Sequence, residues 1–235
     1  KQWPQVAAAL VALDGETVGM QAVDAMCKEF SPLPEEVQAA NAFVNGGGDV
    51  NLLGPAERYI LEVGCKVPHL KQRVSAMQFA SGFDETCASL EAGTDALLHS
   101  VAGVRGSDRF RRVLGIVLQI GNTLNKNTRK GDAAGFKLSS LMKLTQTRTN
   151  ARQTLLEYIV TKVEAGPEAG RDVLRLTEDF PDMAAAARVS YDTMNADVNK
   201  LRSGIKRLEG ALKVAANDGD DAFEAEMGSF HSRAT

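Results

Sequence analysis

Apolar residues recur every three or four positions along almost the whole chain, and no stretch alternates apolar with polar residues. A spacing of three to four is the period of an amphipathic α-helix, whereas alternation would indicate a half-buried strand. No proline lies between Pro68 and Pro167, so most of that stretch should be helix interrupted only by glycine. The pattern predicts an all-α protein with roughly nine helices.

Local signals place some of the helix ends. Pro34 suits the first position of a helix, the two glutamates that follow it favour a helix N-terminus, and the three glycines at 46–48 should end that helix. Asn51 and Asp108 are expected to be N-caps of later helices, because a short polar side chain can accept a hydrogen bond from the first helical turn.

The N-terminal apolar run, residues 6–13, lies between Trp3-Pro4 and Asp14-Gly15. It is much shorter than the roughly 20 apolar residues that cross a bilayer, and its flanks do not suit a signal peptide. We therefore expect a buried helix here. The chain has no initiator methionine, which indicates a piece of a longer protein.

One helix carries a heptad seam, whose residues are spaced alternately three and four apart: Tyr191, Met194, Val198, Leu201, Ile205, Leu208 and Leu212. A seam this regular needs partner helices, either from the same chain, such as residues 83–104, or from a second molecule. An intramolecular bundle is favoured. The pattern breaks after Asn217, and the remaining residues are expected to fray.

Composition is typical of a soluble globular protein, with 44% apolar and 24% charged residues. Cys27, Cys65 and Cys87 are odd in number and lack CxxC spacing. Neither a disulfide framework nor a zinc site is indicated, and a reducing compartment is expected.

Charge is distributed unevenly along the chain. Eleven basic and two acidic residues lie between Arg105 and Arg152, which gives this basic region a charge of +9, so the rest of the chain carries −12 within a total of −3. A positive region on an acidic molecule attracts an acidic partner. The alternatives are a solvated loop whose lysines serve solubility, and nucleic-acid binding, which ranks lower because no aromatic residues are interleaved with the cations.

Motifs for catalysis are missing from the sequence. There is no GxGxxG, and residues 131–137 fall short of a phosphate-binding loop because no GK[ST] follows. His69, His99 and His231 have no cysteine, histidine or carboxylate at ligand spacing in the sequence. The chain is therefore interpreted as a binding or assembly module, without cofactor or metal.

Residues 121–144 contain the most distinctive pattern of the chain. Gly121-Asn122 and Asn125, followed by the segment 135–144, resemble the GN..N turn leading to GF.L..L.KL of the formin homology 2 domain. Further blocks of that family occur in the same order on both sides, at residues 32–36, 48–49, 52–59, 67–83, 107–121 and 154–158. The resemblance covers roughly residues 1 to 210.

The resemblance implies an elongated, crescent-like all-α domain built from a knob, a three-helix coiled-coil region and a post. The boundaries expected on that template are 1–82 for the knob, 83–107 and 183–217 for the coiled-coil helices, 108–182 for the post and 218–235 for a frayed tail.

It also implies a cytoplasmic protein of the actin cytoskeleton. Domains of this family form a head-to-tail ring around the filament barbed end, nucleate filaments and stay on the growing end, where profilin-actin is an indirect partner. A lasso from one subunit wraps around the post of the other. Residues 1–10 match the first knob helix, so the lasso and linker are expected to be missing, and the chain alone is expected to be monomeric and weak in nucleation. Neither nucleic acid nor a membrane is an expected partner.

Particular positions carry the implied contacts. The lasso-binding positions of the post are Gly121, Asn122, Asn125, Gly135, Phe136 and Leu138. Glycine allows close approach of another backbone, and asparagine amides can both donate and accept hydrogen bonds. Phe136 is expected to anchor the turn to the core. These residues could equally cap a helix and close a turn, and both roles are compatible.

The implied actin-binding positions are Ala8, Lys137, Lys143 and Arg148. Arg148 keeps the charge of a residue that is usually lysine in the family. Ala8 departs from the usual branched aliphatic, which removes contact worth on the order of 2 kcal/mol if fully buried. That contact is expected to be weakened, compensated elsewhere, or shifted to Val6 or Leu10. A coiled-coil scaffold without direct actin activity, suggested by the heptad seam, is the alternative function.

Overall fold

The computed structural model describes residues 2–149 and 151–235; Lys1, the first residue matched to the knob helix, lies outside them. The described residues form twelve α-helices and four short 3-10 or π segments, and their single β-bridge joins Arg148 to Thr154. The all-α prediction is confirmed. The helix count exceeds the predicted nine because helices of four residues, such as α2 (Gly15–Val18) and α10 (Met183–Ala186), are too short to show a period.

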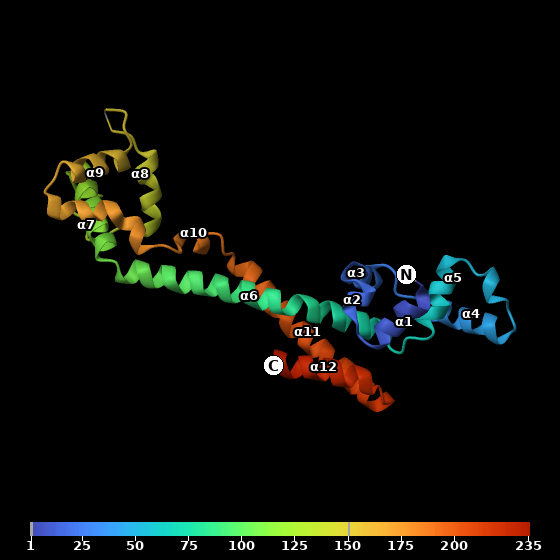
Figure 1. Cartoon of the computed structure of the whole chain (residues 1–235). Helices are drawn as coiled ribbons and strands as arrows, with labels where there is room; N and C mark the ends of the chain where they lie inside the picture. Colours follow the sequence, from blue (N-terminus) through green and yellow to red (C-terminus); the bar gives the residue numbers. More distant parts are fainter. Residues whose placement is uncertain (1, 150) are drawn as a thin grey trace. The chain divides into compact units, whose positions relative to one another are not determined.

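The chain divides into two compact units, of which the first comprises residues 1–90 and 190–235 and the second residues 91–189. Helix α6 (Leu70–Gly106) contributes residues to both. The other elements of the first unit are α1 (Trp3–Val11), α2 (Gly15–Val18), α3 (Met20–Lys28), α4 (Pro34–Asn45), η1 (Val50–Leu52), α5 (Pro55–Tyr59), η2 (Ile60–Gly64), α11 (Tyr191–Asp218) and α12 (Asp221–Ala234) (Figure 1).

Helix α4 begins at Pro34 and ends at the glycine run, as predicted. Asn51 is not an N-cap: the Asp49 carboxylate accepts a hydrogen bond from the Asn51 backbone N–H at 2.9 Å, so Asp49 starts η1.

The N-terminal run is a buried helix, which confirms the prediction for residues 6–13. Four residues of α1 are buried, and they pack against apolar residues of α3, η2 and α6 in one core. Its buried members are Val6, Ala7, Ala9, Leu10, Val18, Val23, Met26, Val63, Val67, Leu70, Val74 and Met77.

The heptad seam finds its partners within the chain. Leu208 is buried in a second core that includes Ala76 of α6 and three large side chains of α12. Gly204 lies so close to α6 that a Cβ there would come within 2.2 Å of the Phe79 ring. The favoured intramolecular bundle is confirmed for this part of the seam, whereas Tyr191 at its start is 77% exposed.

The C-terminal segment is not frayed, so that expectation is wrong. Gly219 adopts a left-handed conformation, and α12 follows with Phe223, Met227 and Phe230 buried against α11. These three residues are spaced four and three apart, so the amphipathic pattern resumes after the Asp-Gly break. The break marks a turn between two packed helices.

A buried arginine ties these parts of the first unit together. Arg73 of α6 is fully buried, forms an ion pair with Asp220, and donates hydrogen bonds to the Val11 carbonyl at 2.7 Å and the Pro68 carbonyl at 3.0 Å. Its guanidinium also lies 5.4 Å from the centre of the Phe223 ring. One cation therefore holds the end of α1, the start of α6 and the start of α12.

The second unit contains α7 (Asp108–Leu124), η3 (Leu138–Met142), α8 (Lys143–Gln146), α9 (Leu155–Glu164), η4 (Glu168–Asp179) and α10 (Met183–Ala186). The N-cap of α7 is Ser107 and not Asp108 as predicted, because the buried Ser107 hydroxyl accepts a hydrogen bond from the Phe110 N–H at 2.9 Å. The same hydroxyl donates to Asp179. Phe110 packs edge-on against Phe180 at 5.7 Å, which joins α7 to the segment after η4.

Candidate functional site

The predicted post motif forms the end of α7 and the loop that follows. The side-chain amide of Asn122 donates to the Ala133 carbonyl, and its carbonyl oxygen accepts from the Ala133 N–H, both at 2.9 Å. Asn125 donates from its side chain to the Gly121 carbonyl at 2.9 Å. The two asparagines therefore close the loop and satisfy a backbone carbonyl at the C-terminus of α7, as expected if these residues cap the helix and close the turn.

Glycines in this loop have different roles. A Cβ at Gly131 would come within 2.7 Å of the Asn125 carbonyl oxygen, so this position is closed to side chains. At Gly121 and Gly135 a Cβ would meet no described atom within 4 Å other than those of its chain neighbours and its own helix backbone, so both positions have open space beside them. Gly121 and Gly135 could therefore accept close approach of another chain.

An open depression of about 440 Å³ lies along this end of α7. It is lined by Gly115, Leu118, Gln119, Asn122, Thr123, Lys126 and Asp132. Of the predicted lasso-binding residues, Asn122 lines it. Phe136 is half-buried and Leu138 is 52% exposed, and neither lines the depression. Sequence reasoning missed the α7 positions Leu118 and Gln119, which share this surface, because no motif marks them.

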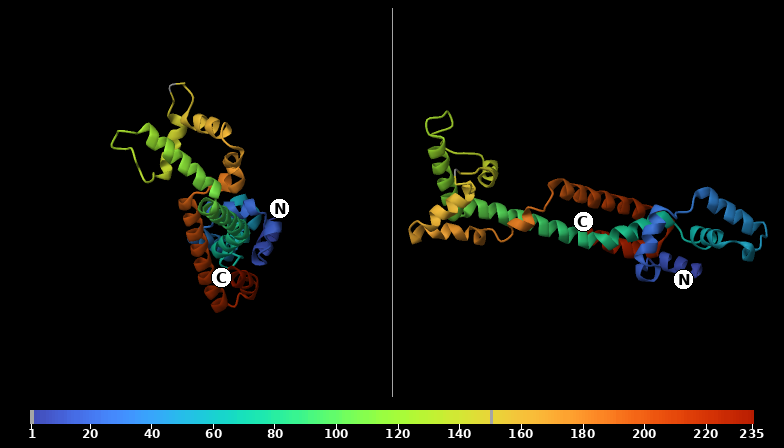
Figure 2. Two further views of the ribbon diagram at one scale, coloured as in Figure 1. Left: turned by 90° about the vertical axis from the view of Figure 1, so that its left-hand side faces the viewer. Right: turned by 90° about the horizontal axis from the view of Figure 1, so that it is seen from above.

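The predicted actin-binding cations Lys137, Lys143 and Arg148 are all exposed. Lys137 precedes η3, Lys143 begins α8, and Arg148 lies in the turn that leads to α9. The Arg148 guanidinium donates to the Arg152 carbonyl at 2.9 Å, which fixes its direction within the turn. Figure 2 shows the loop after α7 and the turn after α8 projecting as two separate excursions from the helices of the second unit.

The turn after α8 is fixed at its far end by a capping box. The Thr154 hydroxyl accepts from the Glu157 N–H at 3.2 Å, and the Glu157 carboxylate accepts from the Thr154 N–H at 2.6 Å. This backbone hydrogen bond lowers the pKa of Glu157 below its ordinary value. The arrangement anchors the segment that carries Arg148 to helix α9.

Part of the basic region is already paired. Arg109 lies 2.7 Å from Asp179, and Arg112 lies 2.6 Å from Asp172, whose pKa is lowered chiefly by its hydrogen bond from Arg112. These acids follow the arginines by 60 to 70 residues, so the local charge count missed them. The available cationic surface is accordingly smaller than the basic region, and apart from Arg105 its cations follow α7 in the sequence.

Eight cations of the basic region form no ion pair with a carboxylate among the described residues: Arg105, Lys126, Arg129, Lys130, Lys137, Lys143, Arg148 and Arg152. All eight are exposed.

The predicted knob position lies in the first unit. Ala8 is exposed on α1, while Val6 and Leu10 are buried at 5% and 0% exposure. A partner that touches Ala8 cannot reach Val6 or Leu10 without opening the core, so the suggested shift of the contact to those two residues is wrong.

Each histidine has one carboxylate neighbour that sequence spacing did not reveal, at 2.7 Å for His69 and Asp218 and 3.2 Å for His99 and Asp182. His231 lies 3.4 Å from Glu209. Across residues 2–149 and 151–235, no group of three potential ligands is placed to hold a metal ion. No helix in these ranges combines the length and apolarity that a bilayer span requires.

Comparison with known families agrees with the motif in the second unit. Residues 1–235 match the family described as Formin Homology 2 Domain. The chain belongs to the formin homology 2 family.

Named relatives of this formin homology 2 domain include plant proteins. It is 29% identical to "Formin-like protein 20" of Arabidopsis thaliana over 232 residues, which is 97% of this chain and 14% of the relative. It is 28% identical to "Formin-like protein 6" of Oryza sativa subsp. japonica over 234 residues, 98% of this chain and 17% of the relative. It is 30% identical to "Formin-like protein 17" of Arabidopsis thaliana over 216 residues, 92% of this chain and 42% of the relative.

The chain thus spans less than half of the length of each of these relatives. Its post-motif residues lie in the second unit and its Ala8 position in the first.

Proposed function

We propose that this chain is the actin-binding module of a formin, which as a dimer nucleates actin filaments and stays associated with the growing barbed end. Membership of the formin homology 2 family over all 235 residues carries the proposal. The chain acts by binding and assembly, and no cofactor takes part.

In this proposal the cations that follow α7 in the sequence bind an acidic surface of the actin protomer. Lys137, Lys143 and Arg148 are exposed and have no carboxylate partner among the described residues, so their charge is available to a second molecule. Charge of one sign on an exposed surface mainly accelerates association and sets its orientation. Arg148 contributes a planar donor group whose direction is already held by the turn.

The open positions Gly121 and Gly135 support the second part of the proposal, that the post receives the lasso of a sister subunit. The side-chain amides of Asn122 and Asn125 are half-buried and already hold the loop after α7. Their part in lasso binding is therefore to keep the backbone of this loop in one conformation. Substitution of Asn122 should therefore weaken lasso binding indirectly.

Pyrene-actin assembly with the dimeric, lasso-containing form of the protein tests the proposal. The double variant Lys143→Glu with Arg148→Glu should lose most of the effect on barbed-end elongation. The matched control, Arg171→Glu with Arg188→Glu, makes the same change of charge at exposed positions of the second unit outside the motif and should retain it. An unchanged effect of the Lys143→Glu with Arg148→Glu variant would favour the alternative, a coiled-coil scaffold without direct actin contact.

Ala8 offers a test in the opposite direction. Replacement by isoleucine restores the branched aliphatic usual in the family at an exposed position, so the core of the first unit is unaffected. Effects on elongation should appear at a lower protein concentration, because the isoleucine side chain adds contact with actin worth up to about 2 kcal/mol. Gln5→Ile, one turn earlier on the exposed face of α1, is the control and should change little. Sedimentation of the chain by itself checks whether it is monomeric.

A further inference from the structure

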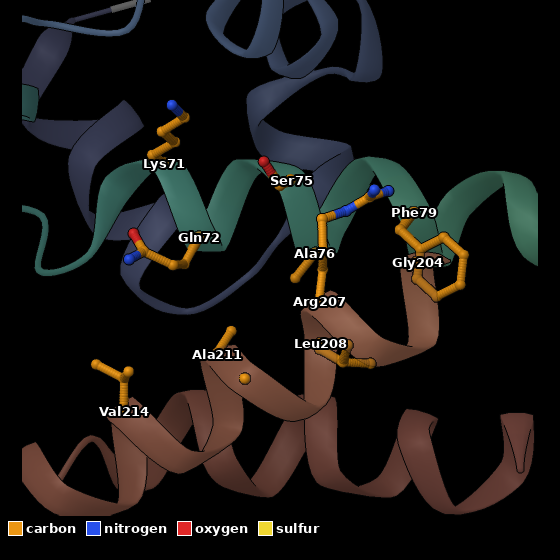
Figure 3. Close-up of a pocket in the computed structure, with 11 residues that line it drawn as sticks. Lys71, Gln72, Ser75, Ala76, Phe79, Gly204, Arg207, Leu208, Ala211 and Val214 are labelled. Carbon is orange, nitrogen blue, oxygen red and sulfur yellow. The ribbon is translucent and has the colours of Figure 1, made fainter. Parts of the chain in front are cut away.

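Helices α6 and α11 form a groove in the first unit that is lined by none of the predicted actin-binding or lasso-binding residues. A hollow of about 380 Å³ lies between them, with a mostly apolar lining that includes Phe79 of α6 and Leu208 of α11 (Figure 3). Its full lining is Lys71, Gln72, Ser75, Ala76, Phe79, Gly204, Arg207, Leu208, Gly210, Ala211 and Val214.

A second hollow of about 510 Å³ continues the first along α6 and is lined in part by Cys27, Phe83, Thr86 and Leu201. Both hollows share Ser75, Phe79 and Arg207, so they form one continuous surface, here called the α6–α11 groove. Its residues on α6 run from 71 to 86, a distance of about 22 Å at 1.5 Å per residue.

The floor of the groove is already held in place. Ala76 and Leu208 are buried members of the core that α12 shares with this helix pair. Phe79 and Phe83 pack edge-on against each other at 5.6 Å, and both pack against Phe230. A ligand would therefore meet a preformed apolar surface and would not have to order it.

The charges of the groove have one sign. Lys28, Lys71, Lys200 and Arg207 line it, and none of its described lining residues is a carboxylate. Figure 3 shows the guanidinium of Arg207 projecting from α11 toward α6. Asp24 lies next to the groove, and its carboxylate accepts a hydrogen bond from the lining residue Gln78 at 2.6 Å.

Within the part of the chain that is described, none of the four cations forms an ion pair. This contrasts with the unit as a whole, which has 12 basic and 19 acidic residues and so a net charge of −7.

We propose that the α6–α11 groove binds an acidic amphipathic helix of a partner protein. About 15 helical residues match its length, apolar residues spaced three and four apart would enter the two hollows, and flanking carboxylates would reach the cations on both rims. The same helix pair already packs against one such helix of this chain. Helix α12 buries Phe223, Met227 and Phe230 there and exposes Glu224 and Glu226.

The proposal is independent of actin binding, because its residues lie in the first unit and include neither Ala8 nor any cation of the basic region.

Fluorescence anisotropy with two designed probes tests it. One is a fluorescein-labelled 16-residue helix with leucines at alternating spacings of three and four and glutamate elsewhere, and the other has lysine in place of every glutamate. The acidic probe should bind and the basic probe should not. Binding should weaken when salt is raised from about 0.05 to 0.5 M, because exposed charges are screened.

Two variants locate the site. Lys71→Glu with Arg207→Glu should weaken binding of the acidic probe at least tenfold, and Ser75→Trp should block it, because Ser75 is exposed where the two hollows meet. The control, Arg202→Glu with Lys213→Glu, changes two exposed cations of α11 outside the groove and should bind normally. Circular dichroism checks that every variant is folded.

Failure of both probes to bind, or equal binding of both, would overturn the proposal. So would acidic-probe binding that survives the groove variants. Binding to phosphatidylserine vesicles that is lost in Lys71→Glu with Arg207→Glu, without probe binding, would assign the groove to a lipid surface instead.

Discussion

Replacement of Arg73 by methionine should lower the free energy of unfolding of the first unit by about 3–5 kcal/mol. Arg73 is fully buried, and its guanidinium donates hydrogen bonds to the carboxylate of Asp220 and to the carbonyls of Val11 and Pro68. Three charge-assisted hydrogen bonds would together contribute roughly 5–9 kcal/mol. Methionine refills most of the volume, and Asp220 keeps 13% of its side-chain surface exposed and can recover part of its hydration. The expected loss is therefore smaller than that sum.

Urea unfolding followed by tryptophan fluorescence measures this loss specifically in the first structural unit. Trp3 is the only tryptophan of the chain and packs edge-on against Tyr59 at 5.2 Å in the first unit. The exposed control Arg202→Met should change the free energy of unfolding by less than about 0.5 kcal/mol.

A double-mutant cycle with Asp220→Asn then isolates the ion pair. Asparagine removes the charge but keeps an oxygen that can cap α12, as the Asp220 carboxylate does for the Phe223 N–H at 3.3 Å. The double variant with Arg73→Met should lose less than the sum of the single losses, by about 1 kcal/mol or more. A loss below about 1 kcal/mol for Arg73→Met, or additive losses, would refute the assignment of Arg73 as the tie between α1, α6 and α12.

Further expectations follow from single contacts. Gly204→Ala should cost about 1–3 kcal/mol in urea unfolding, because its Cβ would meet the Phe79 ring at 2.2 Å and the helices must separate; an unchanged midpoint would mean that the ring can turn away. Asn122→Ala removes both hydrogen bonds to the loop after α7 and should increase amide hydrogen exchange there, while the first unit stays protected. Burial raises the pKa of Tyr59 to about 12, so its contribution to stability is complete below pH 10 and lost as the pH rises toward 12; absorbance titration should show this step, and Tyr59→Phe should remove it. The lowered pKa of Glu157 contributes stability above its ordinary value of 4.5 that is lost as the pH falls further, and Glu157→Gln should abolish that part of the acid dependence of thermal unfolding.

Periodicity was sufficient for the helical class, the buried first helix and the intramolecular packing of the seam near Leu208, because these follow from burial of an apolar stripe. Short polar side chains were a less reliable guide to the N-cap residue of each helix. Ser107 rather than Asp108 caps α7, since Ser107 can also donate to Asp179, a residue 72 positions away.

The C-terminal prediction failed for a related reason. Asp-Gly-Asp is typical of the end of a structured region, but the Asp220 carboxylate caps α12 and also forms an ion pair with Arg73, which is far away in the sequence and ties this helix start to α6. The surface available for binding was also decided at long range. Arg109 and Arg112 count as free cations in the sequence, and η4 provides the acids that pair with them.

The sequence by itself determined the family and the helical periodicity, because these depend on residue type and local spacing. Only the tertiary structure decided which charges stay unpaired and where apolar residues of distant helices leave a hollow. Ion pairing and cavities depend on distances between residues far apart in the chain, and spacing along one helix does not encode those distances.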